Sequence, residues 1–263
     1  MVLSRPKPRI MNKFVNFPLL VFAVSFLALW LSALIGDFFR KRLRPLEEGD
    51  REAFGVIQAG ALTLLGLLIG FTFSMAVSRY DQRKNYEEAE ANAIGTEYVR
   101  AGLLPPADAA KLRSLLGNYL DQRVLFYTAS DEQQLRQIDT NTAQLQNDLW
   151  SVVQDRAALQ PIPTVALVVA GMNDVLNSQG YTQAAWWNRI PVAAWVLLIL
   201  IAIGCNLLIG YGAHRTSAFL FVVLPLAVSV SFFLIADIES PRRGVIRVQP
   251  QNLLSVYQTV HGH

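Results

Sequence analysis

The stretch of sequence that decides the fold runs from residue 54 to residue 80 and reads FGVIQAGALTLLGLLIGFTFSMAVSRY. Its residues 54–78 carry no charge, and Gln58 is their only strongly polar side chain. About 20 apolar residues in an α-helix, at ~1.5 Å per residue, cross the ~30 Å hydrocarbon core of a bilayer. Arg79 and Tyr80 follow with the basic and aromatic side chains that favour the membrane–water interface. The stretch therefore predicts a transmembrane helix.

Three other windows have the same character, and they cover residues 15–36, 190–212 and 217–236. The first follows a basic leader, but its apolar run is longer than the ~7–15 residues of a signal-peptide core, which favours a retained span. In the whole chain 52% of residues are hydrophobic and 16% are charged, whereas soluble domains usually carry about 25% charged residues. We therefore predict an all-α membrane protein with four transmembrane helices.

The region between the second and third spans looks like an ordinary soluble sequence and shows no sustained two-residue alternation, so we expect helices and no sheet. The expected helices are 82–102, which continues the second span, 106–128, 131–159 and 164–178. The chain then divides into four parts, namely an arm with spans one and two (1–80), a helical region (81–185), spans three and four (186–240) and a tail (241–263).

Two local features of this region predict details of its helices. Ser130 with Gln133 three positions later is a capping-box signature for the start of the helix at 131. The acidic run at residues 87–90 is most simply a solvated helix face, with Lys84 placed to pair with Glu88.

The distribution of Lys and Arg predicts the orientation in the membrane. Placing both termini and residues 81–185 in the cytoplasm puts 17 of the 23 basic residues inside and 6 outside, as the positive-inside rule favours. The first connection, residues 37–53, does not follow this rule, because it lies outside in this orientation and yet carries five basic residues.

Several classes of function are not supported by the sequence. It contains no glycine-rich phosphate loop, nucleophile elbow or His/Glu metal motif, so we expect no enzyme, no cofactor and no metal site. Its basic residues cluster at helix ends rather than in one patch, so we expect no nucleic acid. No ionisable side chain lies in the core of a span, which argues against a proton-driven pump. A passive oligomeric pore and a non-conducting scaffold or stress sensor remain.

Small residues recur at every fourth position of the second span, namely Gly66, Gly70, Ser74 and Ser78. Such a stripe lets helix backbones approach closely. It is open whether this helix packs within one subunit or against copies of itself around an axis. In the second case Thr63, Leu67 and Phe71 face the axis as a narrow apolar constriction that gates by dewetting.

Four charged residues follow the fourth span: Asp237, Glu239, Arg242 and Arg243. They form either a local ion-pair knot that ends the helix before Pro241, or an interface at which the arginines attract anions or anionic headgroups.

Three stretches carry a family resemblance: GFTFSMAVSRY (70–80), EANAIGTEY (90–98) and DIESPRRGVIRV (237–248). They resemble the bestrophin-like domain family of bacterial membrane proteins, and the likeness covers nearly the whole chain. A more distant resemblance links it to bestrophins, which are pentameric anion channels. These have four spans per subunit, cytosolic termini and a large cytosolic region between spans two and three.

The bestrophin pore-lining span has a Gly-Phe pair followed, eight residues after the Phe, by an Arg-aromatic pair, and residues 70–71 and 79–80 match that spacing. The family's hydrophobic neck then corresponds to Thr63, Leu67 and Phe71, of which Phe71 matches in kind, Leu67 is apolar and Thr63 is neither. The acidic calcium clasp after the fourth span is missing, because Pro241 and two arginines stand there, so calcium gating is not expected.

The resemblance implies a homo-oligomeric ion channel in a bacterial inner membrane, a pentamer by analogy. It would pass small ions, anions in preference to cations. The alternative is a non-conducting scaffold or stress sensor that recruits partners through its cytoplasmic helices.

Overall fold

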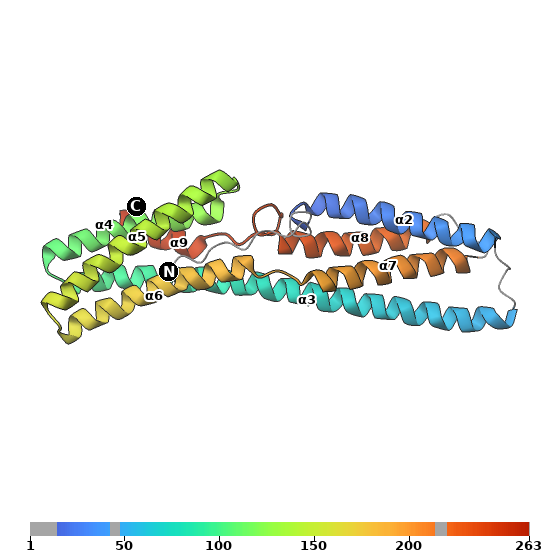
Figure 1. Cartoon of the computed structure of the whole chain (residues 1–263), viewed down its shortest axis with the longest axis horizontal. Helices are drawn as coiled ribbons and strands as arrows, with labels where there is room; N and C mark the ends of the chain where they lie inside the picture. Colours follow the sequence, from blue (N-terminus) through green and yellow to red (C-terminus); the bar gives the residue numbers. More distant parts are fainter. Residues whose placement is uncertain (1–14, 43–47, 214–219, 263) are drawn as a thin grey trace. The chain divides into compact units, whose positions relative to one another are not determined.

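The structure is a computed structural model that describes residues 15–42, 48–213 and 220–262, and no strand occurs among them. The helices, labelled in Figure 1, are α2 (Pro18–Arg42), α3 (Glu48–Arg100), α4 (Pro106–Thr128), α5 (Glu132–Leu159), α6 (Pro163–Trp187), α7 (Val192–Gly212), α8 (Leu220–Glu239) and α9 (Gln251–His261). One 3-10 turn, η1 (Ala101–Leu103), follows α3. The predicted all-α fold is confirmed.

The described residues form two compact units. Residues 15–78 and 189–246 are called the membrane unit here, and residues 79–188 and 247–262 are called the helical unit. The sequence of α3 belongs to both, because this helix begins at Glu48 and ends at Arg100.

The membrane unit contains the four predicted spans. Four helical segments of the described chain are long and apolar enough to cross a membrane. They include α2, the first half of α3, α7 and α8. The first 14 residues and residues 217–219 of the predicted fourth span lie outside the described residues.

Helices α2 and α7 of the membrane unit approach each other most closely through two glycines. A Cβ on Gly36 would overlap the carbonyl oxygen of Leu207, and a Cβ on Gly210 would overlap that of Ala33. Only glycine lets two helix backbones come this near, because any side chain would separate them. These two positions therefore set the α2–α7 contact.

The helical unit encloses a core of aliphatic and aromatic side chains. Helix α4 has the predicted bounds, and its buried residues Leu112, Leu116, Tyr119 and Leu120 follow the i, i+4, i+7, i+8 pattern of one helix face. Trp186 closes part of this core with its ring 4.9 Å from that of Phe126.

Two local predictions in the helical unit are wrong, and one helix was not predicted. Helix α5 is capped by Asp131, whose carboxylate accepts the N–H of Gln134 at 2.8 Å, because a charged oxygen suits the helix dipole better than the hydroxyl of Ser130. Helix α6 does not end at 178 but continues to Trp187, since Gly180, just beyond the predicted end, costs the helix only about 1 kcal/mol. The tail also contains a helix, α9, for which no prediction was made.

Candidate functional site

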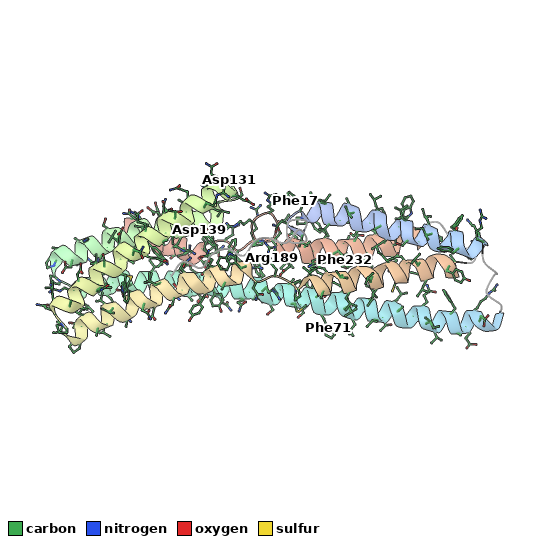
Figure 2. The ribbon with its side chains drawn as sticks, viewed as in Figure 1. Phe17, Phe71, Asp131, Asp139, Arg189 and Phe232 are labelled. Atoms are coloured by element: carbon green, nitrogen blue, oxygen red, sulfur yellow. The ribbon has the colours of Figure 1, made fainter. Side chains whose placement is uncertain are left out.

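The three predicted neck residues lie on the exposed side of α3. Leu67 is 53% exposed, and Phe71, which is labelled in Figure 2, is 60% exposed. Thr63 is exposed as well, but its hydroxyl donates to the carbonyl oxygen of Ala59 at 2.9 Å. That bond satisfies the Thr63 hydroxyl within the helix, so the hydroxyl needs no partner from outside it.

The predicted small-residue stripe is also uncovered. Added Cβ atoms on Gly66 and Gly70 would meet nothing within 4 Å, and Ser74 and Ser78 are exposed. In the apolar 18-residue stretch of α3, only 6% of the residues are buried, compared with 28% in the corresponding stretch of α2 and 44% in that of α8. The stripe therefore does not pack inside one protomer.

Beyond the span, α3 carries arginines that bind the end of α6. Arg79 Nη1 donates to Asn188 Oδ1 at 2.9 Å. The buried Arg83 donates to the carbonyl oxygens of Ala185 at 3.3 Å and Asn188 at 3.4 Å. Carbonyls in the last turn of a helix lack intrahelical partners and carry partial negative charge, so a guanidinium suits them. Tyr80 packs against the core of the helical unit.

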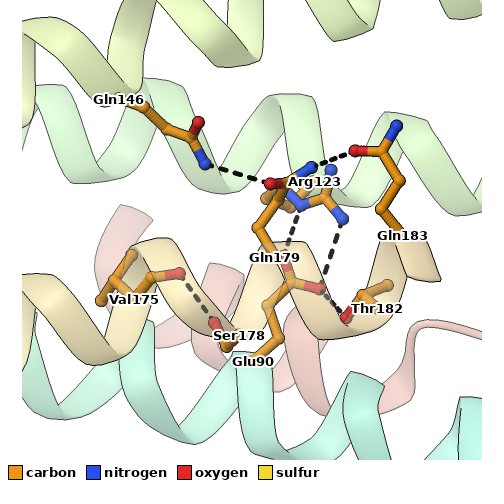
Figure 3. Close-up of polar contacts among 8 residues, drawn as sticks. All are labelled: Glu90, Arg123, Gln146, Val175, Ser178, Gln179, Thr182 and Gln183. Atoms are coloured by element: carbon orange, nitrogen blue, oxygen red, sulfur yellow. Dashed lines mark hydrogen bonds and ion pairs between the residues drawn. The ribbon is translucent and has the colours of Figure 1, made fainter. Parts of the chain in front are cut away.

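The prediction of a solvated acidic face is wrong for two of its residues. Glu88 is exposed, as predicted, but Glu87 and Glu90 are fully buried. Figure 3 shows Glu90 bound by residues of two other helices, Arg123 of α4 and Thr182 of α6. The Arg123 guanidinium pairs with both carboxylate oxygens, and the Thr182 hydroxyl donates to Oε2 at 2.9 Å. Although burial alone would lower the pKa of Arg123, the charge of Glu90 raises it.

Glu87 fixes the tail helix to the helical unit. Its two carboxylate oxygens accept the Leu253 N–H at 2.9 Å and the Asn252 side-chain amide at 2.7 Å. These donors belong to the first turn of α9, where backbone N–H groups lack partners within the helix. A carboxylate of α3 thereby supplies the cap that α9 does not find in its own sequence.

A third acidic residue of α3, Glu97, is buried without a hydrogen-bond partner for either carboxylate oxygen among the described residues. It lies against α6 at Gly171, where an added Cβ would overlap Glu97 Oε2. Burial raises the pKa of Glu97 to about 8; the charge of Arg100 opposes this shift and that of Asp174 adds to it.

The two acidic residues after the fourth span bind backbone groups. Asp237 accepts the N–H groups of Val245 and Ile246, both at 2.8 Å, and so folds the loop back onto the end of α8. Glu239 accepts the N–H of Ile190 at 2.8 Å. On the same loop, Arg242 is half-buried and Arg243 is exposed.

The loop also lies beside the start of α2. The Arg243 guanidinium lies 4.5 Å above the centre of the Phe17 ring. The Ser240 hydroxyl donates to the carbonyl oxygen of Asn16 at 3.3 Å. An exposed cation is therefore held at the interface end of α2.

The buried acidic face of α3 could have been found from the sequence. Glu87, Glu90, Ile94 and Glu97 follow the 3–4–3 spacing of a single helix face. Because Ile94 on that face is apolar, the spacing indicates that the acidic residues share a buried face. No signal of this kind identifies Arg123 and Asn252 as their partners.

These observations define the class: a multi-pass, all-α membrane protein whose second span continues as a helix that bears buried charges. A family model described as "Bestrophin-like domain" matches residues 19–253. The chain therefore belongs to the bestrophin-like domain family.

Solved structures support the same fold. A bacterial bestrophin homologue from Klebsiella pneumoniae matches with a TM-score of 0.64 and 13% identity, over 93% of this chain and 97% of that one. A point mutant of a bestrophin homologue from the same organism matches with a TM-score of 0.64 and 14% identity, over 98% and 100% of the two chains. No curated protein sequence matches this chain.

Proposed function

We propose that this protein forms a homo-oligomeric ion channel whose pore is lined by residues 54–78 of α3. The observation that carries the proposal is the uncovered state of this span, in which 6% of the apolar window is buried. A span that packs so little within its own protomer is covered by lipid or by other copies of the chain. Gly66 and Gly70 favour packing against other copies of the chain, because small residues let two helix backbones come close together.

The neck and the stripe are neighbouring rows on α3. Gly66 and Gly70 each precede a neck residue, Leu67 or Phe71, by one position, which is about 100° of helix rotation. Copies that pack through the stripe would therefore turn Thr63, Leu67 and Phe71 toward a common axis. A ring of such apolar side chains is a constriction that conducts only when wetted.

The family resemblance favours small anions as the conducted ions and a pentamer as the assembly. The distribution of Lys and Arg favours the cytoplasm for both termini and for residues 81–185, in a bacterial inner membrane. A passive pore of this kind requires no enzymatic activity.

Flux through liposomes that contain the purified protein tests the proposal. We expect chloride flux in the wild type and a severalfold higher flux after Leu67→Ala with Phe71→Ala, because the narrow apolar ring is removed. Phe73→Ala is a matched control, since Phe73 is 39% exposed but lies off the neck row. An unchanged flux in the double variant would show that Leu67 and Phe71 do not line the pore.

Particle images of the solubilised protein separate this function from that of a non-conducting scaffold. A symmetric ring with α3 nearest the axis supports the channel. A monomer, or a dimer without an axial path, would favour the scaffold instead.

A further inference from the structure

The membrane unit contains an apolar cavity of about 100 Å³ between α2, α7 and α8. Its floor is buried and includes Leu29 of α2, Trp195 of α7 and Phe232 of α8, and the last two rings pack edge to face at 6.2 Å. Its rim is open, because Val24 and Ile199 are 45% and 37% exposed. The cavity is therefore a groove that opens on the outside of this unit.

The packing of α2 and α7 explains why the groove exists. The backbones of these helices meet at Gly36 and Gly210, near the C-terminal end of each. The groove lies at their N-terminal ends, where α2 places the small residues Ser25 and Ala28. Small side chains on one helix leave space that larger ones would fill in a close-packed interior.

The dimensions and chemistry of the groove suit a hydrocarbon chain. Its walls extend from Val21 to Leu29 and from Trp195 to Ile203, which is about 12 Å along each helix. The hydrocarbon of one leaflet is ~15 Å thick. The Ser25 hydroxyl donates to the carbonyl oxygen of Phe22 at 3.0 Å, so it is already satisfied. Apolar cavities of ~150 Å³ stay dry and bind apolar ligands such as benzene.

A cation lies over Phe17, two residues after the lining residue Val15. Val15 lines the groove. The backbone carbonyl oxygen of Asn16 accepts a hydrogen bond from the Ser240 hydroxyl, and the ring of Phe17 lies beneath the guanidinium of Arg243. The N–H of Val21, another lining residue, bonds the carbonyl oxygen of Phe17 at 3.0 Å. Arg243 is exposed at the point where a lipid phosphate would lie above a chain held in the groove, and guanidinium binds phosphate in a two-pronged manner.

We propose that each protomer binds one anionic phospholipid, with an acyl chain in the α2–α7–α8 groove and its phosphate on Arg243. None of the residues that form this site lies on α3, so the site does not overlap the proposed pore lining. The headgroup contact selects an anionic lipid, and the groove holds its chain.

Native mass spectrometry of the full chain in mild detergent tests the site, with phosphatidylglycerol and phosphatidylcholine of identical chains as probes. We expect one phosphatidylglycerol per protomer to bind more tightly than phosphatidylcholine. Ala28→Phe fills the groove and should weaken both lipids by about tenfold or more, whereas Ala23→Phe, on an exposed position of α2 outside the groove, should not. Equal binding by these two variants would overturn the proposal.

The headgroup is tested separately. Arg243→Gln should lower the preference for phosphatidylglycerol over phosphatidylcholine by about fivefold, while Lys84→Gln in the helical unit should leave it unchanged. An unaltered preference in Arg243→Gln would refute the headgroup contact. If Ala28→Phe does not fold, as judged by circular dichroism, Ile199→Trp narrows the groove from α7. Unreduced lipid binding in that variant would equally exclude the groove.

Discussion

The two halves of α3 follow opposite patterns of burial. Between residues 54 and 78 the helix exposes large apolar side chains, including Leu67 and Phe71. Between residues 79 and 100 it buries charged ones, including Arg83, Glu90 and Glu97. One uninterrupted helix thus presents apolar groups outward in the membrane unit and encloses ionisable groups in the helical unit.

The difference shows that the surrounding medium decides which side chains need a partner. A leucine that faces lipid or another apolar helix loses nothing by exposure, whereas a carboxylate taken out of water must find cations or N–H donors. Glu87 and Glu90 have found such donors, and Glu97 instead has a raised pKa. Substitutions in the two halves should therefore have different consequences.

The largest effect is expected for Glu90→Ala in the helical unit. It leaves the guanidinium of Arg123 buried without its carboxylate, which costs about 3–5 kcal/mol of unfolding free energy. Thermal or denaturant unfolding, followed by circular dichroism, measures the loss. Glu88→Ala is the matched control, because Glu88 is exposed, and should change stability by less than about 0.5 kcal/mol. Equal stability of the two variants would contradict a stabilising role for the pair.

Next in size is the pH dependence that Glu97 imposes. Its folded-state pKa of about 8 lies above the value of about 4.3 for an unfolded chain, so the unfolded state releases its proton first as pH rises. Its contribution to stability is therefore complete below pH 4 and is lost as pH rises toward 8, at up to ~1.4 kcal/mol per pH unit. Between pH 6 and pH 8 we expect a loss of about 2 kcal/mol.

Glu97→Gln should remove this dependence, since a neutral amide has no proton to lose. Unfolding midpoints of both proteins at several pH values supply the measurement. A wild type whose stability changes with pH no more than that of Glu97→Gln would show that Glu97 is ionised in the fold at neutral pH.

A smaller effect separates the glycines within the membrane unit. Gly210→Ala should lower the unfolding free energy of the protomer by about 1–2 kcal/mol, because the new methyl group overlaps the backbone of α2. Gly70→Ala should cost the protomer nothing, since open space surrounds that position, but it should lower the fraction of oligomer in light scattering. Unchanged oligomer in Gly70→Ala would indicate that the stripe faces lipid.

The smallest effect concerns the tail helix. Glu87→Ala should weaken the attachment of α9 by about 1 kcal/mol or slightly more, because its first-turn donors lose a charged acceptor. Hydrogen exchange across residues 251–261 should then become severalfold faster, with Glu88→Ala again as the control. Unchanged exchange would show that apolar contacts, such as that of Val256 with Gly95, hold α9 without the cap.

The sequence by itself determined the four spans, the continuation of span two and the bounds of α4, because hydrophobic length and periodicity are local properties. Only the tertiary structure decided the partners of the acidic face of α3 and the attachment of α9. Glu87 and Leu253 are 166 positions apart, and no local pattern in either segment specifies the other. Gly36 and Gly210 are also specified only by the tertiary structure. In the sequence each is a glycine in an apolar run, and only the contact between α2 and α7 shows that two backbones meet there.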